Sequence, residues 1–148
     1  MEFPDGFNII RGDEITLKLA EKYPGDEDGV LPFYYYDIFE SSTGDFAGKI
    51  SLRIGDNRHS YYNGHIGYEI EPEKQGRGYA GKACRLVLPV ARAHGMTRLY
   101  LTCKESNAAS RKTIEKLGGT YIETVKIPEW CFFYKKGIED YRIYKLLL

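Results

Sequence analysis

The sequence predicts an α/β domain in which antiparallel strands come first and strands alternating with helices follow. Short aromatic and β-branched segments, separated by Gly, Pro and Asp turns, fill the first half of the chain, which is typical of strand hairpins. In the second half, two segments with helical periodicity alternate with short apolar runs. A chain of 148 residues without an internal repeat or a low-complexity linker suits a single domain over residues 1–148.

The first half contains the strands of the expected hairpins. Ile15, Leu17 and Leu19 alternate with Thr16 and Lys18, which is the period-two pattern of a strand with one buried face. A Ser-, Gly- and Asp-containing turn after the next aromatic run returns the chain as a hairpin. The strands expected here are Glu14–Tyr23, Pro32–Glu40, Phe46–Ile54 and His65–Glu71.

The second half begins with a helix over Gly78–His94. Its apolar residues recur every three or four positions and so share one helical face, and Gly95 stops it. Ser106 or Asn107 can cap a second helix that runs to Leu117. The remaining expected elements are the strands Leu99–Cys103, Tyr121–Ile127 and Tyr141–Leu147.

Charge and cysteine content argue against several functional classes. Lys plus Arg and Asp plus Glu both number 21, so net charge gives no reason to expect nucleic acid or an anionic membrane as a partner. The three cysteines lack metal-ligand spacing and make a poor disulfide framework, and no metal site is expected. The chain start lacks the basic and apolar regions of a signal peptide, and no apolar run approaches the roughly 20 residues that span a bilayer. We therefore expect a reduced, cytoplasmic protein.

The segment Gln75–Ala80 carries the clearest chemical signal. It leads from a strand through a turn into a helix, and Gly76 and Gly78 flank Arg77. Glycines let a ligand approach the main chain closely, and the first N–H groups of a helix have no internal partner. The positive end of the helix dipole adds to their attraction for anions. Lys74, Arg77 and Lys82 supply extra positive charge, and the whole arrangement predicts a site for a diphosphate.

The segment differs from two other phosphate-binding motifs. Residues 76–81 match the Gly-x-Gly-x-x-Gly of a dinucleotide site in letters, but no strongly apolar strand precedes them and no βαβ unit opens the chain. A Walker loop needs Gly-Lys-Ser/Thr, which is absent. A nucleotide-binding module therefore stays a weaker alternative.

Two blocks of sequence resemble the GCN5-related N-acetyltransferases (GNAT). The first is the Ile-x-Pro-x-x-Gln-Gly-Arg-Gly-Tyr-Ala run over residues 70–80. The second contains an Asn-Ala-Ala-Ser turn over residues 107–110 and a Glu-Lys-Leu-Gly-Gly close over residues 115–119. Both stand in the family's order and spacing, and the RimJ/RimL-like branch is the most similar. The resemblance implies the acyl-CoA N-acyltransferase fold, a mixed but mostly antiparallel twisted sheet flanked by helices in three layers.

The resemblance also implies a cosubstrate, acetyl-CoA, and the residues that hold it. The family's strand backbone meets the acetyl carbonyl and pantetheine arm, its glycine loop the pyrophosphate, and its helix-capping Asn the pantetheine. The matching positions are Tyr68, Glu69, Ile70, Gln75, Gly76, Arg77, Gly78, Tyr79, Ala80, Asn107 and Ser110.

Three residues are candidates for moving protons in the reaction. The family's common acid, a Tyr seven residues after the helix Asn, corresponds to Ile114 here. The RimL-like branch suggests Ser110 as acid and Glu129 as base, and Glu69 on the cofactor strand is a third candidate. Each also has a structural interpretation, as a first-turn helix serine, a solvated loop residue and an outward-facing strand residue. An acyl-enzyme on Cys103 is a further alternative, which direct attack by a bound amine does not need.

The chain departs from the family before its second strand. Only about ten residues, Tyr23 to Pro32, stand where relatives carry two helices that cover the acceptor, so this helical region is shortened. The acceptor wall is then truncated, supplied by Trp130–Tyr134, or supplied by the second subunit of a homodimer. We expect an N-acetyltransferase that moves an acetyl group to a primary amine. The alternative is a non-catalytic acyl-CoA-binding domain.

Overall fold

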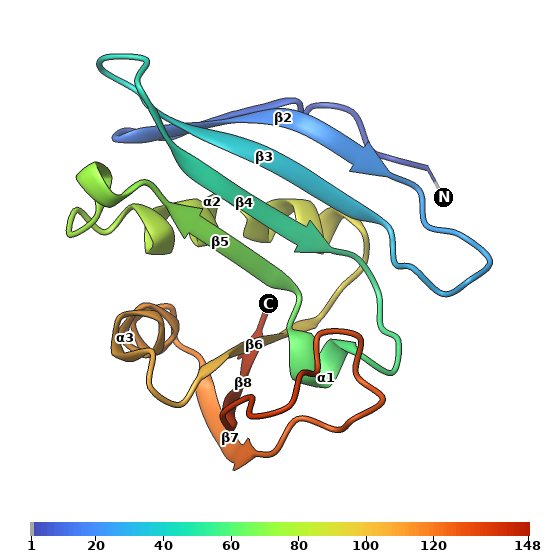
Figure 1. Cartoon of the computed structure of the whole chain (residues 1–148). Coiled ribbons are helices and arrows are strands. Elements are labelled where there is room, and N and C mark those ends of the chain that lie inside the picture. The colour runs from blue at the N-terminus through green and yellow to red at the C-terminus, as the bar shows by residue number, and fades with distance from the viewer. Residues whose placement is uncertain (1) are drawn as a thin grey trace.

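The computed structural model describes residues 2–148 and divides the strands between two antiparallel sheets (Figure 1). The first sheet has the order β1-β2-β3-β4-β5, with neighbours in the sheet following one another in the chain. Short turns join β1 to β2 and β3 to β4, as in hairpins, whereas the β4–β5 connection contains the short helix α1. The bounds are Ile9–Arg11, Ile15–Tyr23, Phe33–Glu40, Phe46–Arg53 and Ile66–Ile70 for β1 to β5.

The second sheet has the order β6-β8-β7, so the last strand of the chain lies in its middle. Its strands are Arg98–Lys104 (β6), Thr120–Val125 (β7) and Tyr141–Leu147 (β8). Every strand predicted from the sequence is confirmed. In place of one continuous sheet, however, two antiparallel sheets meet at an angle, and β1 was not predicted because it is only three residues long.

Both long predicted helices are present. Helix α2, Tyr79–Ala93, contacts β2, β4 and β5, and helix α3, Ala108–Lys116, contacts α2 and β6. A short α1, Ser60–Asn63, and a single 3-10 turn η1, Pro72–Lys74, complete the set. Figure 1 shows α2 lying against one face of the five-stranded sheet and α3 below its N-terminal end.

The core lies between α2 and that face of the sheet. Alternate residues of β3 point into it: Tyr34, Tyr36 and Ile38 are almost fully buried. They face the apolar side of α2, including Ala83 and Val87. This burial of apolar area is the main stabilising term of the fold.

The opposite face of the first sheet has no helix from the β2–β3 connection. Residues 24–32 form turns and extended chain, with Asp26 Oδ1 accepting from the Asp28 and Val30 N–H groups at 3.0 and 3.2 Å. The predicted shortening of this region is therefore confirmed. None of the helices in residues 2–148 is long and apolar enough to cross a membrane.

His65 joins the two sheets where they meet. Its N–H donates to the Tyr100 carbonyl at 2.8 Å, and the Tyr100 N–H donates to His65 Nδ1 at 2.9 Å. Because Nδ1 accepts, the proton lies on Nε2, which donates to the Gly55 carbonyl at 2.9 Å. Beyond this point β5 and β6 share no ladder in the described chain, so the strands diverge. These contacts give His65 a structural role at the junction of the two sheets.

We predict that His65→Leu lowers the free energy of unfolding by about 1–3 kcal/mol, because it leaves the buried Tyr100 N–H without an acceptor. Burial also lowers the pKa of His65 below its ordinary 6.5. As pH falls below 6.5, His65 therefore binds a proton more readily in the unfolded chain than in the folded chain. The free energy of unfolding falls as a result. Urea unfolding at about pH 7.5 and pH 5.5 should show a smaller loss in the variant than in the wild type.

The control is His94→Gln, which removes a less buried imidazole that bonds the Tyr34 hydroxyl at 2.7 Å. An equal pH response in wild type and His65→Leu would contradict the assigned role of His65.

Candidate functional site

A cleft of about 840 Å³ opens between the end of β5, the N-terminus of α2 and the first turn of α3. It brings together the two sequence blocks, which are separated by more than twenty residues in the chain. We call it the α2–α3 cleft. Of the predicted cofactor residues, Arg77 alone is not part of its lining. The others that line it are Tyr68, Glu69, Ile70, Gln75, Gly76, Gly78, Tyr79, Ala80, Asn107 and Ser110.

The glycine loop exposes backbone donors to this cleft. Gly76 and Gly78 have φ values of +81° and +75°, which residues with a Cβ rarely adopt. The first intrahelical bond of α2 runs from Lys82 N–H to the Gly78 carbonyl. Within the described chain, the N–H groups of residues 76–81 donate to no other group. A fan of free N–H groups at the positive end of a 15-residue helix suits a diphosphate.

Glu40, which sequence reasoning missed, anchors the loop from the end of β3. Its carboxylate accepts from Lys74 Nζ at 2.7 Å, Arg77 Nη1 at 2.9 Å and the Tyr79 hydroxyl at 2.5 Å. The hydrogen bonds from Lys74 and Tyr79 lower the pKa of Glu40 to about 2. Glu40 continues the buried alternation of Tyr34, Tyr36 and Ile38, and a carboxylate in such a position needs partners. That pattern is the signal that could have identified it.

The polar side chains of the glycine loop bond to other groups of the protein and so fix the conformation of the loop. Lys74 and Arg77, expected to face a phosphate, lie on Glu40, and Lys82 forms an ion pair with Glu14. Gln75 Nε2 donates to the Ile70 carbonyl at 3.1 Å, which ties the loop to the end of β5. The groups left free for a ligand are therefore mainly backbone N–H groups.

Two hydroxyls meet across the α2–α3 cleft. Asn107 caps α3, since its Oδ1 accepts from the Ser110 N–H at 3.1 Å. The Ser110 hydroxyl lies 2.5 Å from the Tyr68 hydroxyl of β5. Burial raises the pKa of Tyr68, so its hydroxyl keeps its proton near neutral pH. We call Tyr68 and Ser110 the hydroxyl pair.

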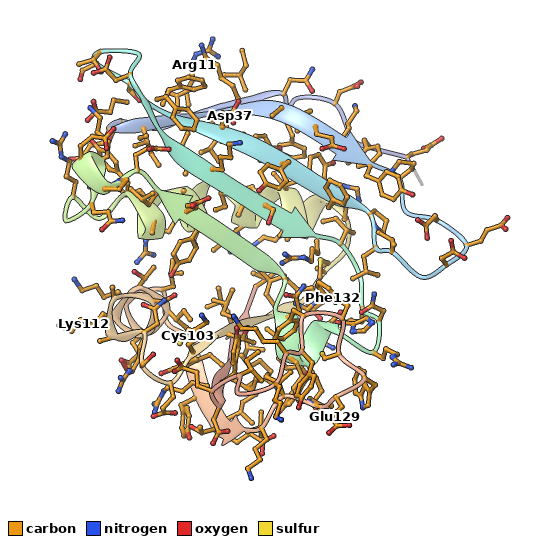
Figure 2. The ribbon with its side chains drawn as sticks, in the orientation of Figure 1. Arg11, Asp37, Cys103, Lys112, Glu129 and Phe132 are labelled. Carbon is orange, nitrogen blue, oxygen red and sulfur yellow. The ribbon has the colours of Figure 1, made fainter. Side chains whose placement is uncertain are left out.

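The other candidates lie elsewhere. Glu69 is exposed on β5, opposite Lys49 in register, and contributes to the cleft rim. Glu129 is exposed in the loop after β7 and lines neither of the two hollows described here. Figure 2 shows it on the side of the molecule away from Lys112 of α3. Cys103 is buried, which raises the pKa of its thiol and makes it a poor nucleophile.

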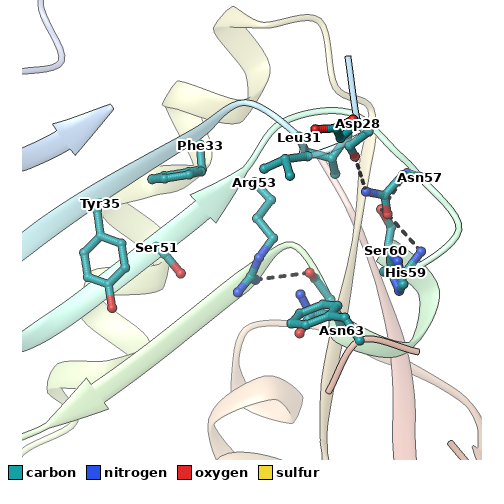
Figure 3. A pocket seen from close by; sticks show the side chains of 14 residues that line it. Asp28, Leu31, Phe33, Tyr35, Ser51, Arg53, Asn57, His59, Ser60 and Asn63 are labelled. Atoms are coloured by element: carbon teal, nitrogen blue, oxygen red, sulfur yellow. Dashed lines mark hydrogen bonds between the residues drawn. The ribbon is translucent and has the colours of Figure 1, made fainter. Parts of the chain in front are cut away.

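A second hollow of about 410 Å³ lies beside the start of β5, and we call it the β4 pocket (Figure 3). β3, β4, α1 and the loop after β7 all contribute to it. Phe132 belongs to the segment Trp130–Tyr134 that the sequence suggested as a substrate wall. Its lining is Asp28, Gly29, Val30, Leu31, Phe33, Tyr35, Ser51, Arg53, Asn57, His59, Ser60, Asn63, Gly64 and Phe132.

Solved structures with this fold include several acetyltransferases. The acetyl transferase of Salmonella typhimurium that modifies the N-terminal serine of ribosomal protein L7/L12 aligns with a TM-score of 0.62 and 22% identity, over 78% of this chain and 64% of that one. A GNAT-family acetyltransferase of Bacillus anthracis gives 0.70 and 17%, over 94% and 98%. A RimL ribosomal L7/L12 α-N-protein acetyltransferase in complex with coenzyme A gives 0.70 and 17%, over 95% and 98%. At these identities the likeness shows the fold.

The sequence comparisons assign the family. No curated protein matches the chain significantly. A family model described as an acetyltransferase (GNAT) domain, by contrast, matches residues 12–120. This span includes the glycine loop, the Asn107 cap and the strand that carries Glu40. Since the match covers well over half of the 148 residues, the chain belongs to the GNAT acetyltransferase family.

Proposed function

We propose that the protein is an acetyl-CoA-dependent N-acetyltransferase acting on a primary amine, of a small molecule or a peptide N-terminus. The observation that carries this proposal is the fan of free N–H groups over residues 76–81, which opens into the same cleft as Asn107 and Ser110. A diphosphate on the fan would leave the pantetheine arm to run between β5 and α3. The coenzyme A complex of a protein with this fold supports the same assignment.

The edge strand β5 would hold the reacting carbonyl. β4 pairs with one edge of β5, while the other edge faces the cleft without a strand partner. Alternate N–H groups along Tyr68 to Ile70 are therefore free to contact the acetyl oxygen. Such a fixed donor stabilises the negative charge that develops on that oxygen during acyl transfer.

The reaction we propose is direct attack in a ternary complex. The neutral amine nitrogen forms a bond to the acetyl carbon, the carbon–sulfur bond breaks, and the thiolate of coenzyme A takes up a proton. The hydroxyl pair supports Ser110 as the group that donates this proton. The Tyr68 hydroxyl, which is hydrogen-bonded to Ser110, can then return a proton to it. The amine proton leaves to Glu69, to Glu129 or to water, and Glu69 is the nearer of the two carboxylates to the cleft.

The second candidate is a non-catalytic acyl-CoA-binding domain. It is favoured by Ile114, which occupies the position of the Tyr that acts as general acid in the family. Ile114 is buried in the core. The second candidate is also favoured by the lack, within the described chain, of any carboxylate bonded to the hydroxyl pair. The cytoplasmic location and the homodimer stay predictions.

Two measurements test the function. We expect calorimetric titration to show binding of coenzyme A and no binding of NAD. The reason is that the loop lacks the strongly apolar strand that precedes it in dinucleotide-binding sites. We then expect thiol release from acetyl-CoA in the presence of amines and short peptides. Failure to bind coenzyme A at millimolar concentration would remove both candidates, while binding without acetyl transfer to any amine would favour the second.

We predict that Glu40→Gln weakens coenzyme A binding on the order of tenfold, because Lys74, Arg77 and Tyr79 lose the carboxylate that fixes the loop. The control is Asp45→Asn, whose carboxylate also lies near Lys74, at 3.5 Å, but is largely exposed. Titration calorimetry measures both. Equal affinity in Glu40→Gln and wild type would contradict the anchoring role.

The same carboxylate predicts a pH dependence. Because its folded pKa is about 2 and its ordinary value 4.5, its contribution to stability is fully present above 4.5 and is lost as pH falls toward 2. The difference in urea midpoint between wild type and Glu40→Gln should therefore shrink over this range. A constant difference would show that the charge of Glu40 is not what stabilises the loop.

We predict that Ser110→Ala and Tyr68→Phe each lower kcat by roughly a hundredfold, with little change in coenzyme A affinity, because each removes a hydroxyl from the proposed proton path. Their effects should not add, since the two groups bond each other. The matched control is Tyr121→Phe, which breaks an exposed pair with Thr124 at 2.7 Å. Wild-type kcat in both single variants would exclude the hydroxyl pair.

Glu69→Gln and Glu129→Gln, measured across pH, separate the two candidate bases. The true base should show a lowered kcat/KM and a lost acidic limb. A carboxylate whose replacement leaves the profile unchanged is not the base.

A further inference from the structure

Arg53, at the end of β4, is a cation without an acidic partner. Its Nη1 donates to the Gly64 carbonyl at 3.3 Å, and within residues 2–148 no carboxylate lies within 4.0 Å of its nitrogens. Burial lowers the pKa of its guanidinium, although Arg remains charged at neutral pH. A partly desolvated charge is costly unless a counter-charge meets it.

The guanidinium points into the β4 pocket. Figure 3 shows it reaching from β4 between Phe33 and Tyr35 on one side and Asn57 and Ser60 on the other. It is the one Lys or Arg among the described residues that line the pocket. One cation, unaided by a second, matches a carboxylate better than a doubly charged phosphate.

The position of the guanidinium relative to β5 matters for catalysis. A Cβ placed on Gly67 would lie 3.5 Å from Arg53 Nη2 and 3.2 Å from Ser51 Oγ, so the missing side chain leaves room for the guanidinium over the strand. Tyr68, the next residue, points to the other face of β5 and into the α2–α3 cleft. Arg53 therefore lies across β5 from the place proposed for the thioester.

The rest of the pocket fits the carbon skeleton of a small ligand. Leu31, Phe33 and Phe132 provide apolar walls, and Phe132 is 66% exposed, so a ligand would cover it. The one acidic residue among the described residues of the lining, Asp28, is exposed.

We propose that the β4 pocket is the acceptor site and that Arg53 selects acceptors carrying a carboxylate together with the amine to be acetylated. The carboxylate accepts two parallel hydrogen bonds from the guanidinium of Arg53. The amine of the same acceptor extends past Gly67 toward the thioester. This inference rests on the proposed acetyltransferase function and adds its substrate class. The carboxylate can belong to a free amino acid or to an acidic side chain beside a peptide N-terminus.

The test compares acceptors that carry a carboxylate with the matching amides. Glycine, β-alanine, leucine and phenylalanine are each paired with the matching primary amide, and peptides with Glu in second place are paired with their Gln counterparts. In the wild type we expect kcat/KM to favour the acid of at least one pair by roughly 10- to 100-fold, the range of a charge-assisted hydrogen bond. The pair that responds tells free acids from peptides.

Arg53→Met, which keeps the aliphatic stem, should abolish that preference, so that kcat/KM for each acid falls to the level of its amide. Arg58→Met is the control, because Arg58 is exposed and stacks on Trp130 at 4.4 Å outside the pocket lining. Unchanged coenzyme A affinity checks that both variants are folded. Equal use of acids and amides by the wild type, or a preference that survives Arg53→Met, would overturn the proposal.

A direct readout separates this inference from the proposed function. The Nε–H signal of Arg53 in an NMR spectrum, assigned by its loss in Arg53→Met, should shift on titration with the acids and not with the amides. If no acceptor is acetylated while the signal shifts, the acetyltransferase proposal fails and the carboxylate site stands. If transfer occurs without a shift or a preference for acids, the carboxylate site fails alone.

Discussion

The paired hydrogen bonds between His65 and Tyr100 fix the place at which β5 and β6 separate, and the candidate site depends on that separation. They join the start of β5 to β6, and beyond them the two strands share no ladder in the described chain. Without that separation β5 would have a strand on both edges, and its N–H groups would be used in a ladder. The cleft that receives both sequence blocks therefore exists because one buried neutral histidine ends the pairing where it does.

Strands and helices were predictable because their patterns are local. The alternation in β2 and the helical face of α2 follow from the spacing of apolar residues, and the structure has both within a residue or two of the expected bounds. The elements that were missed, β1 and α1, have three and four residues, too few for a period to show. The division into two sheets depends on a contact across 35 residues, which no local pattern encodes.

The candidate site was predictable where it is made of backbone and not where it is made of side-chain partners. Gly76 and Gly78 indicate a backbone conformation that other residues rarely adopt, and both have positive φ values in the structure. The roles assigned to Lys74 and Arg77 differ, because a basic residue beside a phosphate loop has the same sequence appearance whether it faces a ligand or a carboxylate. Glu40 lies more than 30 residues away in the chain, and the fold alone brings it there.

The shortened region before β3 bears on the separate roles that we propose for the α2–α3 cleft and the β4 pocket. With no helices in residues 24–32, the proposed acceptor pocket on the outer face of the first sheet is lined by its strands, the β2–β3 connection, the α1 region and the loop after β7. Arg53 and Phe132 belong to this lining, one charged and one apolar. In the proposed reaction, β5 separates a cofactor cleft built from backbone donors from an acceptor pocket built from side chains. Since the backbone donors suit any acyl-CoA, selectivity in such a chain must reside in the few side chains of the pocket.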